Sequence, residues 1–274
     1  MRLGIASSLN HTSPEHWARQ LSELGCKSAV FPLNCNSDKT LIKEYACAAK
    51  ENDIVIAEVG IWNNMLDKDA EQRKKNIDYN IRQLILADEI GAVCAVNIAG
   101  TPYAKRWDGP HKLNFSDEIF ELTVNTIKEI LTQANPQKTH FSIESMPWMI
   151  PSGPEEYLKL LNAVDHKQFT AHLDIVNMIT SPKRYFFNDE FLRECFETLK
   201  GRICSCHLKD IKLLDGFTFQ LKECACGEGE LDIELFAKLC DEQNPDMPLL
   251  IEHLTTDEEY KESLLYVQKR LGIK

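Results

Sequence analysis

The chain has 274 residues, of which 31 are Lys or Arg and 42 are Asp or Glu, so its formal net charge at pH 7 is −11. This acidic balance disfavours a protein that binds the phosphates of nucleic acid, because such binding needs a basic surface that releases counterions. No stretch reaches the roughly 18 apolar residues that a membrane span requires, and the N-terminal segment becomes polar too early for a secretory signal peptide. The sequence therefore predicts a cytoplasmic protein that binds neither nucleic acid nor membrane.

Short apolar runs alternate with longer amphipathic stretches along the whole chain. The predicted strands are Leu3–Ala6, Ser28–Leu33, Ile54–Ile61, Cys94–Ala99, His140–Met146, Phe169–Ile175, Ile203–Leu208 and Leu249–Leu254. The clearest helical patterns are Pro14–Leu24, Lys39–Lys50, Asp69–Ile90, Ser116–Thr132, Phe191–Leu199, Ile233–Gln243 and Asp257–Leu271. Proline at a helix start, as at Pro14 and Pro154, supports such boundaries because its fixed φ suits the first helical position.

Strand–helix repetition of this kind predicts a parallel sheet covered by helices. Eight units suit a closed (β/α)₈ TIM barrel, an α/β fold in one domain spanning residues 1–274, better than an open doubly wound sheet. A dinucleotide-binding fold is disfavoured because no Gly-x-Gly-x-x-Gly follows the first strand. The one insertion is Lys209–Leu231, in which Phe217–Cys224 is expected to form a short hairpin arm or lid beside the active face.

The ten cysteines raise the question of disulfides or a thiolate zinc site. An intracellular chain of this length usually keeps its thiols reduced. The pairs Cys204/Cys206 and Cys224/Cys226 lack the two-residue gap of zinc ribbons. Because residues two apart in a strand share one face, Cys204 and Cys206 are expected to be small apolar fillers.

In barrels of this kind, catalytic residues lie where strands end and the following loops begin. Four successive predicted strands each end in a polar residue among apolar neighbours: Glu144, Asp174, His207 and Glu252. Side-chain alternation allows all four to point into the mouth of the barrel. Three carboxylates crowded in a pocket of low dielectric repel one another, and a divalent cation removes this repulsion. Imidazole with carboxylates suits Mn²⁺, Co²⁺, Mg²⁺ or Zn²⁺, so the pattern predicts a metal site.

Motifs around these strand ends follow a definite order: Ile143-Glu144, His172-Leu173-Asp174, His207-Leu208-Lys209-Asp210, Gly227-Glu228-Gly229-Glu230-Leu231-Asp232 and Ile251-Glu252. With them, essentially the whole chain resembles the xylose-isomerase-like barrel superfamily of sugar isomerases and epimerases, which includes tagatose/psicose 3-epimerases and inosose dehydratases. The resemblance implies that Glu144, Asp174, His207 and Glu252 hold one divalent metal ion, with Mn²⁺ the first expectation. It also implies that Glu144 and Glu252 act as the catalytic acid/base pair.

The chemistry implied by this resemblance is proton transfer next to a sugar carbonyl. A metal ion acting as a Lewis acid stabilises the enediolate that forms when the proton leaves, and two carboxylates remove and return the proton. Return to the opposite face is epimerisation, and return to the neighbouring carbon is isomerisation. Loss of a β-hydroxyl is the alternative that stays open: a dehydratase or β-elimination lyase acting on a keto-sugar, a glycoside or an inosose, alone or as a subunit of a complex.

Substrate contacts are expected from further side chains around the mouth of the barrel. Glu58 and Asn97 lie late in their predicted strands and are expected to hydrogen-bond sugar hydroxyls. Trp62 and Trp148 are expected to wall the pocket, because aromatic rings suit the C–H faces of sugars.

Two further positions depart from the epimerase pattern. Asn177 stands where many epimerases carry a second substrate-binding His, and Lys209 or Lys212 is the candidate to replace an Arg that they carry after the seventh strand. Two histidines are given structural roles: His172 as a hydrogen-bonded core residue and His253 as an outward-pointing one.

The main rival within this fold is DNA abasic-site cleavage of the endonuclease IV type. That chemistry needs a three-zinc cluster with His ligands on early strands, and predicted strands two to four contain no His. The sequence therefore favours a small sugar or sugar derivative as the molecule bound. A homo-oligomer is an open expectation.

Overall fold

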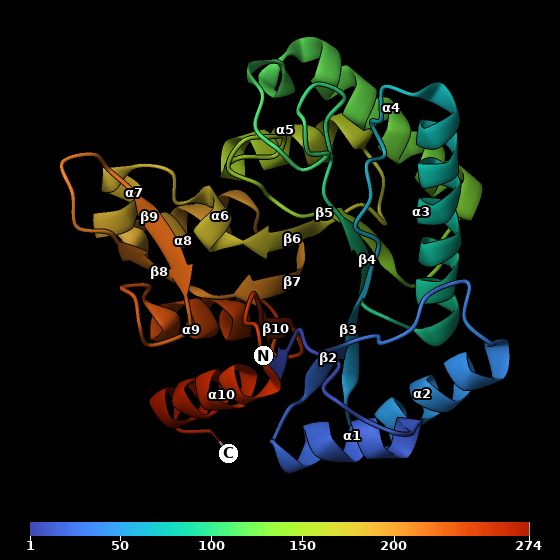
Figure 1. Ribbon diagram of the computed structural model, residues 1–274, viewed down its shortest axis with the longest axis vertical. Helices are drawn as coiled ribbons and strands as arrows, with labels where there is room; N and C mark the ends of the chain where they lie inside the picture. The colour runs from blue at the N-terminus through green and yellow to red at the C-terminus, as the bar shows by residue number, and fades with distance from the viewer. Residues whose placement is uncertain (274) are drawn as a thin grey trace.

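The computed structural model describes residues 1–273. Its centre is a sheet of eight parallel strands in the spatial order β5-β4-β3-β2-β1-β10-β7-β6. These strands are β1 (Arg2–Ile5), β2 (Ser28–Val30), β3 (Val55–Gly60), β4 (Cys94–Asn97), β5 (His140–Ile143), β6 (Ala171–Asp174), β7 (Ile203–Leu208) and β10 (Pro248–Ile251). Parallel bridges from Phe141 to Phe169 and from Glu144 to His172 join β5 to β6. The sheet therefore closes into a barrel (Figure 1).

Helices surround the barrel and connect its strands (Figure 1). They are α1 (Pro14–Glu23), α2 (Lys39–Glu51), α3 (Ala70–Ile90), α4 (Asp117–Ala134), α5 (Pro154–Val164), α6 (Ile175–Met178), α7 (Pro182–Phe186), α8 (Asn188–Thr198), α9 (Ile233–Gln243), α10 (Asp257–Leu271) and the 3₁₀ helix η1 (Lys112–Phe115). Local sequence sets their starts: the Ser13 side chain accepts from the His16 amide, and Thr256 with Glu259 forms a capping box. Within residues 1–273, no helix is both long and apolar enough to cross a membrane.

The (β/α)₈ architecture predicted from the sequence is confirmed, although several predicted strands run too far. β2 ends at Val30 instead of Leu33, and β5 ends at Ile143 instead of Met146. Leu33 and Met146 pack partly buried against the core from the loops that follow these strands. Apolar character at these positions reflects burial under loops, so it does not mark the ends of the strands.

Two kinds of packing fill the barrel and its surroundings. Large side chains, including the fully buried Trp17, Tyr157 and Phe236, belong to the main core between strands and helices. A separate small cluster of Cys94, Val96 and Cys204 is also buried. The barrel interior therefore contains small groups, which leaves room above them for the polar side chains at its mouth.

A β-bulge in β7 corrects the sequence expectation for Cys204 and Cys206. Ala171 pairs with Ile203, but the next residue, His172, pairs with Ser205, so Cys204 is the extra residue. The Cys204 thiol lies 3.4 Å from the Ser142 hydroxyl, whereas the Cys206 thiol lies 3.7 Å from the Met247 sulfur in the main core. The two cysteines therefore pack in different clusters, because the bulge breaks the two-residue alternation on which the expectation rested.

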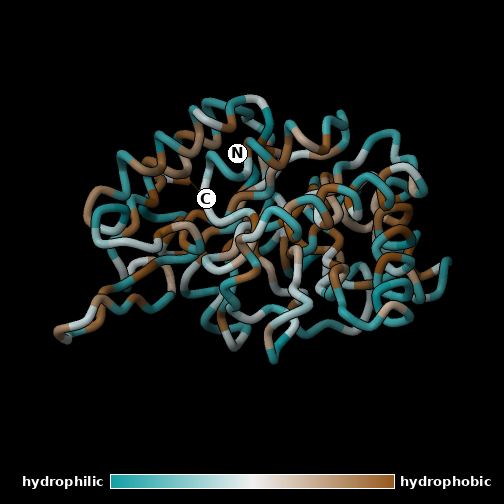
Figure 2. Tube along the Cα trace, turned by 90° about the horizontal axis from the view of Figure 1, so that it is seen from above, coloured by the Kyte–Doolittle hydropathy of each residue, from teal (hydrophilic) through white to brown (hydrophobic). Residues whose placement is uncertain are grey.

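The Lys209–Leu231 insertion contains an antiparallel hairpin formed by β8 (Asp210–Leu213) and β9 (Leu221–Cys224). It projects from the body at the left of Figures 1 and 2, and Phe217 in its turn is fully exposed. The hairpin begins at Asp210, earlier than the predicted Phe217–Cys224 stretch, because Asp210 through Leu213 supply its first strand. The Asp210 carboxylate accepts backbone N–H groups of Gly227, Gly229 and Leu231, which holds the return of the insertion against the barrel.

Gly4 is required by the close approach of β1 to β2. A Cβ atom at this position would lie 1.9 Å from the carbonyl oxygen of Ser28. We expect Gly4→Ala to lower the melting temperature by roughly 2–12 °C, because overpacking costs about 1–3 kcal/mol and each kcal/mol shifts a chain of this size by about 2–4 °C. Gly216→Ala is the matched control, since no atom lies within 4 Å of its added Cβ. Equal melting temperatures of the two variants, measured by circular dichroism, would contradict the expectation.

Candidate metal centre

Four polar side chains converge at the carboxyl ends of β5, β6, β7 and β10. Glu144, Asp174, His207 and Glu252 are all buried, and each offers one ligand atom within 4.8 Å of the others. Ligands on opposite sides of an ion with bonds of about 2.0–2.3 Å lie about 4.0–4.6 Å apart. The structure thus brings together the four predicted metal ligands at a spacing that suits one ion.

Local structure fixes the position of Asp174 in this cluster. It ends β6 and caps the short helix α6, where its Oδ1 accepts the backbone N–H of Asn177 at 3.1 Å. The hydroxyl of Ser145 donates to the Asp174 carbonyl at 3.0 Å. With Oδ1 used by the helix cap, Oδ2 is the oxygen that faces the other ligands.

Two basic side chains lie among the three carboxylates. Nδ1 of His207 is 2.8 Å from Glu252 Oε2 and 3.2 Å from Glu144 Oε1. Nζ of Lys209 is 2.6 Å from Asp174 Oδ2 and 2.9 Å from Glu252 Oε1. The ammonium group therefore touches two of the four ligands.

The pKa values show how strongly burial and charge act in the cluster. Burial raises the pKa of Asp174 to about 8, although the Lys209 ammonium acts in the opposite direction. Burial also acts to raise the pKa of Glu252, but the positive charges of His207 and Lys209 hold it well below its usual value. Conversely, burial disfavours the charged imidazole of His207, yet the surrounding carboxylates, Glu252 foremost, raise its pKa well above the usual value. The buried carboxylates of this cluster are therefore stabilised by nearby positive charge.

This donor set fits a divalent metal ion. Three carboxylates and one imidazole match the hard and borderline ions such as Mg²⁺, Mn²⁺ and Zn²⁺. An ion held by the four residues would compete with Lys209 for Asp174 and Glu252, because the ammonium contacts the same two carboxylates.

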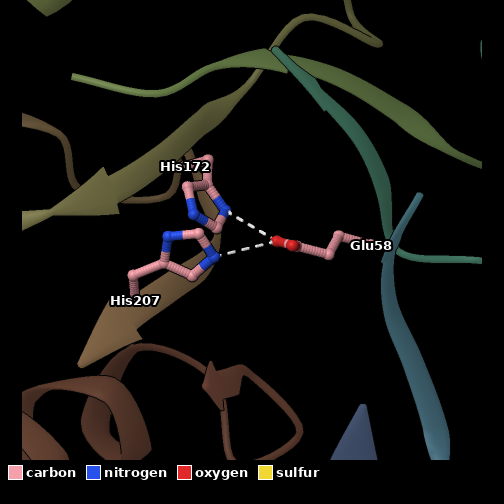
Figure 3. A group of neighbouring side chains, drawn as sticks. All are labelled: Glu58, His172 and His207. Carbon is pink, nitrogen blue, oxygen red and sulfur yellow. Dashed lines mark hydrogen bonds and ion pairs between the residues drawn. The ribbon is translucent and has the colours of Figure 1, made fainter. Parts of the chain in front are cut away.

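A second group of side chains lies deeper in the barrel and shares His207 with the first. Nε2 of His207 is 3.1 Å from Glu58 Oε2, and Nδ1 of His172 is 4.0 Å from the same oxygen (Figure 3). His172 also shares a 2.6 Å hydrogen bond with the Ser205 hydroxyl and packs edge-on against the His207 ring. Burial, together with the neighbouring His207, lowers the pKa of His172 well below its usual value. His172 is therefore a neutral, hydrogen-bonded core histidine.

Two adjoining cavities open above the cluster. One, of about 480 Å³, is lined by Glu58, Trp62, Glu144, His207, Glu252 and His253, among others. The other, of about 720 Å³, is lined by Trp62, Trp107, Glu144, Trp148, Asn177 and His253, among others. Because they share Trp62, Glu144 and His253, they lie side by side as two compartments next to the proposed ligands.

The predicted substrate-contacting residues fall into three positions. Glu58, Trp62, Trp148 and Asn177 line the cavities. Lys209 is buried inside the ligand cluster. In the part of the chain that the structure describes, Asn97 lines neither cavity.

The expectation that Asn97 contacts substrate is not supported by its surroundings. Asn97 is fully buried, and its amide donates to the Asn63 carbonyl and the Asn80 side chain while accepting the Asn63 amide. The polar side chain near the end of β4 is used to hold the loop after β3. The position of Asn97 in the sequence does not indicate that these partners would occupy the hydrogen-bonding groups of its side chain.

The expectation that His253 points outward is wrong. β10 ends at Ile251, and His253 adopts a left-handed conformation with φ of 57°. Its Nδ1 lies 2.9 Å from Glu223 Oε2 and 3.1 Å from Lys209 Nζ, at the wall of both cavities. Because His253 lies beyond the end of β10, strand alternation does not predict the direction of its side chain.

Glu223 is a site residue that sequence reasoning missed. It comes from β9 of the hairpin, and its carboxylate lies 3.2 Å from Lys209 Nζ. The hydrogen bond from His253 is the main cause that lowers the pKa of Glu223 to about 2. Only the folding of the hairpin over the mouth brings this carboxylate to the cluster, and no local motif signals it.

An eight-stranded barrel whose carboxyl mouth brings together carboxylates and an imidazole that could hold a metal ion defines the TIM-barrel class. Within that class, the family described as "Xylose isomerase-like TIM barrel" matches residues 18–270 of the sequence. The chain therefore belongs to the xylose isomerase-like TIM-barrel family, as its motifs predicted. A search of curated proteins finds no significant match.

Solved structures that share this fold include three enzymes of low sequence identity. A probable 3-DHS dehydratase from Bacillus anthracis has a TM-score of 0.74 and 15% identity, covering 100% of each chain. D-Psicose 3-epimerase from Clostridium cellulolyticum H10, solved with D-tagatose, has a TM-score of 0.72 and 12% identity over 99% of this chain and 98% of its own. 3-Keto-D-glucoside 4-epimerase from E. coli has a TM-score of 0.71 and 14% identity over 98% and 99%. At these identities the likeness establishes the fold.

Lys209→Met should strengthen metal binding, because it removes a positive charge that contacts two ligand carboxylates. We expect the Kd for Mn²⁺ in isothermal titration to fall by about tenfold or more, since a unit charge at 4 Å is worth about 4 kcal/mol at an effective dielectric of 20. Lys212→Met is the control, because Lys212 pairs with exposed Glu228 on the insertion. Unchanged or weaker binding by Lys209→Met would show that the ammonium does not compete with the ion.

Proposed function

We propose that this protein is a divalent-metal-dependent sugar isomerase or epimerase that transfers a proton next to a carbonyl. The observation that carries the proposal is the placing of two buried carboxylates, Glu144 and Glu252, on the same cavity and around the same imidazole. Mn²⁺ is the metal we expect, because mixed carboxylate and imidazole donors suit it. Membership of a family with sugar epimerases of the same fold agrees with a sugar or sugar derivative as substrate.

In this proposal, Glu144, Asp174, His207 and Glu252 would hold a divalent ion, which would polarise the substrate carbonyl. Glu144 and Glu252 directly follow β5 and β10, which are separated by β6 and β7 on one side of the barrel. One carboxylate removes the proton from the carbon next to the carbonyl, and the other returns a proton from its own side. Burial of both groups keeps water away from the enediolate and strengthens its electrostatic stabilisation.

The other side chains of the cavity bind and orient the sugar. Trp62 and Trp148 supply aromatic faces for its C–H bonds, and Asn177 offers an amide in the second compartment. The ammonium group of Lys209 contacts Asp174 and Glu252. When the ammonium group leaves these two carboxylates, it contacts a substrate oxygen.

A dehydratase or β-elimination lyase is the second candidate. Two observations favour it: the fold is shared with a probable 3-DHS dehydratase, and a second compartment of about 720 Å³ adjoins the ligand pocket at Glu144. Such a space suits a glycoside or keto-glycoside better than a lone monosaccharide. In this case one of Glu144 and Glu252 removes the same proton, and the carboxyl group of the other protonates the β-oxygen, which leaves as water or an alcohol as the C=C bond forms.

We further infer that the protein works in the cytoplasm. All ten cysteines are free thiols, including the exposed Cys47, and thiols persist in reducing compartments.

A homo-oligomer remains our expectation, because the hairpin presents exposed apolar side chains at Phe217 and Phe219.

Isotope exchange tests the proposed chemistry. Protein loaded with Mn²⁺ and incubated in D₂O with ketoses or 3-keto-glucosides should exchange the proton next to the carbonyl, measured by ¹H NMR. Glu144→Gln and Glu252→Gln, tested at saturating Mn²⁺, should lose about 10²–10⁴-fold in rate because each removes a proton-transfer group. Glu228→Gln, on the exposed insertion, should keep the rate, and EDTA should abolish it. Product formation without exchange, or exchange that survives EDTA, would refute the mechanism.

A further inference from the structure

Glu58 occupies an unusual place for a carboxylate. It lies in β3, is 2% exposed, and reaches across the barrel to His207 in β7. In the closed barrel β3 is not a neighbour of β7, because β2, β1 and β10 separate them on one side and β4, β5 and β6 on the other. The contact is therefore made through the interior and depends on the whole ring of strands.

A buried carboxylate needs a partner, since burying an unpaired charge is costly. The acid oxygen Oε2 of Glu58 has His207 Nε2 at 3.1 Å and His172 Nδ1 at 4.0 Å (Figure 3). The second contact is too long for a hydrogen bond, and His172 Nδ1 already forms a hydrogen bond with the Ser205 hydroxyl at 2.6 Å. His207 is thus the hydrogen-bonding partner of Glu58.

The two nitrogens of His207 face different groups. Nδ1 lies 2.8 Å from Glu252 and 3.2 Å from Glu144, on the side of the proposed metal ligands. Nε2 faces Glu58. An imidazole that binds a metal ion through Nδ1 must carry its proton on Nε2, and that N–H needs an acceptor.

We propose that Glu58 is a positioning residue that accepts the Nε2–H of His207 and so directs the Nδ1 lone pair toward the metal ion. Carboxylates that hold a metal-binding imidazole in this way fix its tautomer and orientation and increase its basicity. The inference rests on the proposed metal-dependent function. It replaces the sequence-based expectation that Glu58 hydrogen-bonds a sugar hydroxyl.

A second metal ion is the competing explanation of this cluster. Glu58, His172 and His207 offer ligand atoms within 4.8 Å of one another, and His207 would then bridge two ions. The hydrogen bond between Ser205 and His172 Nδ1 disfavours it, because Nδ1 is the ring nitrogen that approaches Glu58 and would have to give up that partner. The two explanations differ in the number of ions bound per chain.

Metal affinity of Glu58 variants tests the proposal. We expect Glu58→Leu, which has no acceptor, to weaken Mn²⁺ binding by about 10–100-fold in isothermal titration. Glu58→Gln keeps an acceptor oxygen and should recover part of this loss. The visible spectrum of bound Co²⁺ should change in Glu58→Leu, because the imidazole ligand is no longer held. Each variant should bind at most one ion per chain, and Glu228→Leu, which removes an exposed charge, should behave like the wild type.

Several outcomes would overturn the proposal. Unchanged Mn²⁺ affinity together with a raised KM in both Glu58 variants would make Glu58 a substrate contact. Two ions per wild-type chain, with one lost in Glu58→Leu, would establish the second metal site. If Glu58→Leu does not fold, equal affinity of Glu58→Gln and wild type, with an unchanged Co²⁺ spectrum, would refute the role by itself.

The same measurements separate this inference from the proposed function. Wild-type protein that binds Mn²⁺ but shows no exchange in D₂O would refute the isomerase proposal. The Mn²⁺ affinities of the Glu58 variants would still test the role of Glu58. Wild-type protein that binds no divalent ion would refute both.

Discussion

Mutual repulsion of buried carboxylates is the constraint on which this structure depends. Glu58, Glu144, Asp174 and Glu252 lie at or below the mouth of one barrel, and all are almost completely buried. His207 and Lys209 are the basic groups in direct contact with them. Like charges at close range and low dielectric repel one another by several kcal/mol, and the positive charges of His207 and Lys209 offset this repulsion. The same four strand ends hold the carboxylates and the imidazole that could bind a metal ion.

Closure of the sheet is what creates the crowding. The strands β5, β6, β7 and β10 follow one another around the ring, so their carboxyl ends bring the four proposed ligands to one place. β3 completes the site from the opposite side by presenting Glu58 to the far nitrogen of His207. Small side chains such as Cys94 and Cys204 fill the interior below, and the bulge in β7 keeps Ser205 beside His172. The scaffold therefore sets both the position and the orientation of the imidazole.

The hairpin formed by β8 and β9 connects the site to the surface. Glu223 on β9 contacts Lys209 and His253, and both of these residues also approach Glu252. A chain of alternating charges thus runs from the ligand cluster to a segment that projects from the barrel (Figure 1). Because Lys209 contacts both Asp174 and Glu223, any displacement of its ammonium alters the charge balance on the hairpin side as well.

The sequence by itself determined the barrel and the kind of residue at each strand end. Alternating apolar runs and amphipathic stretches are local patterns that the sequence shows directly. The sequence also gives the residue type at each strand end, which is Glu144, Asp174, His207 and Glu252. The tertiary structure decided which side chains meet. The Glu58–His207 contact crosses the barrel, Asn97 is saturated by partners from other elements, and His253 turns inward through a left-handed backbone. These features depend on contacts between distant segments and on loop conformation, which strand periodicity does not encode.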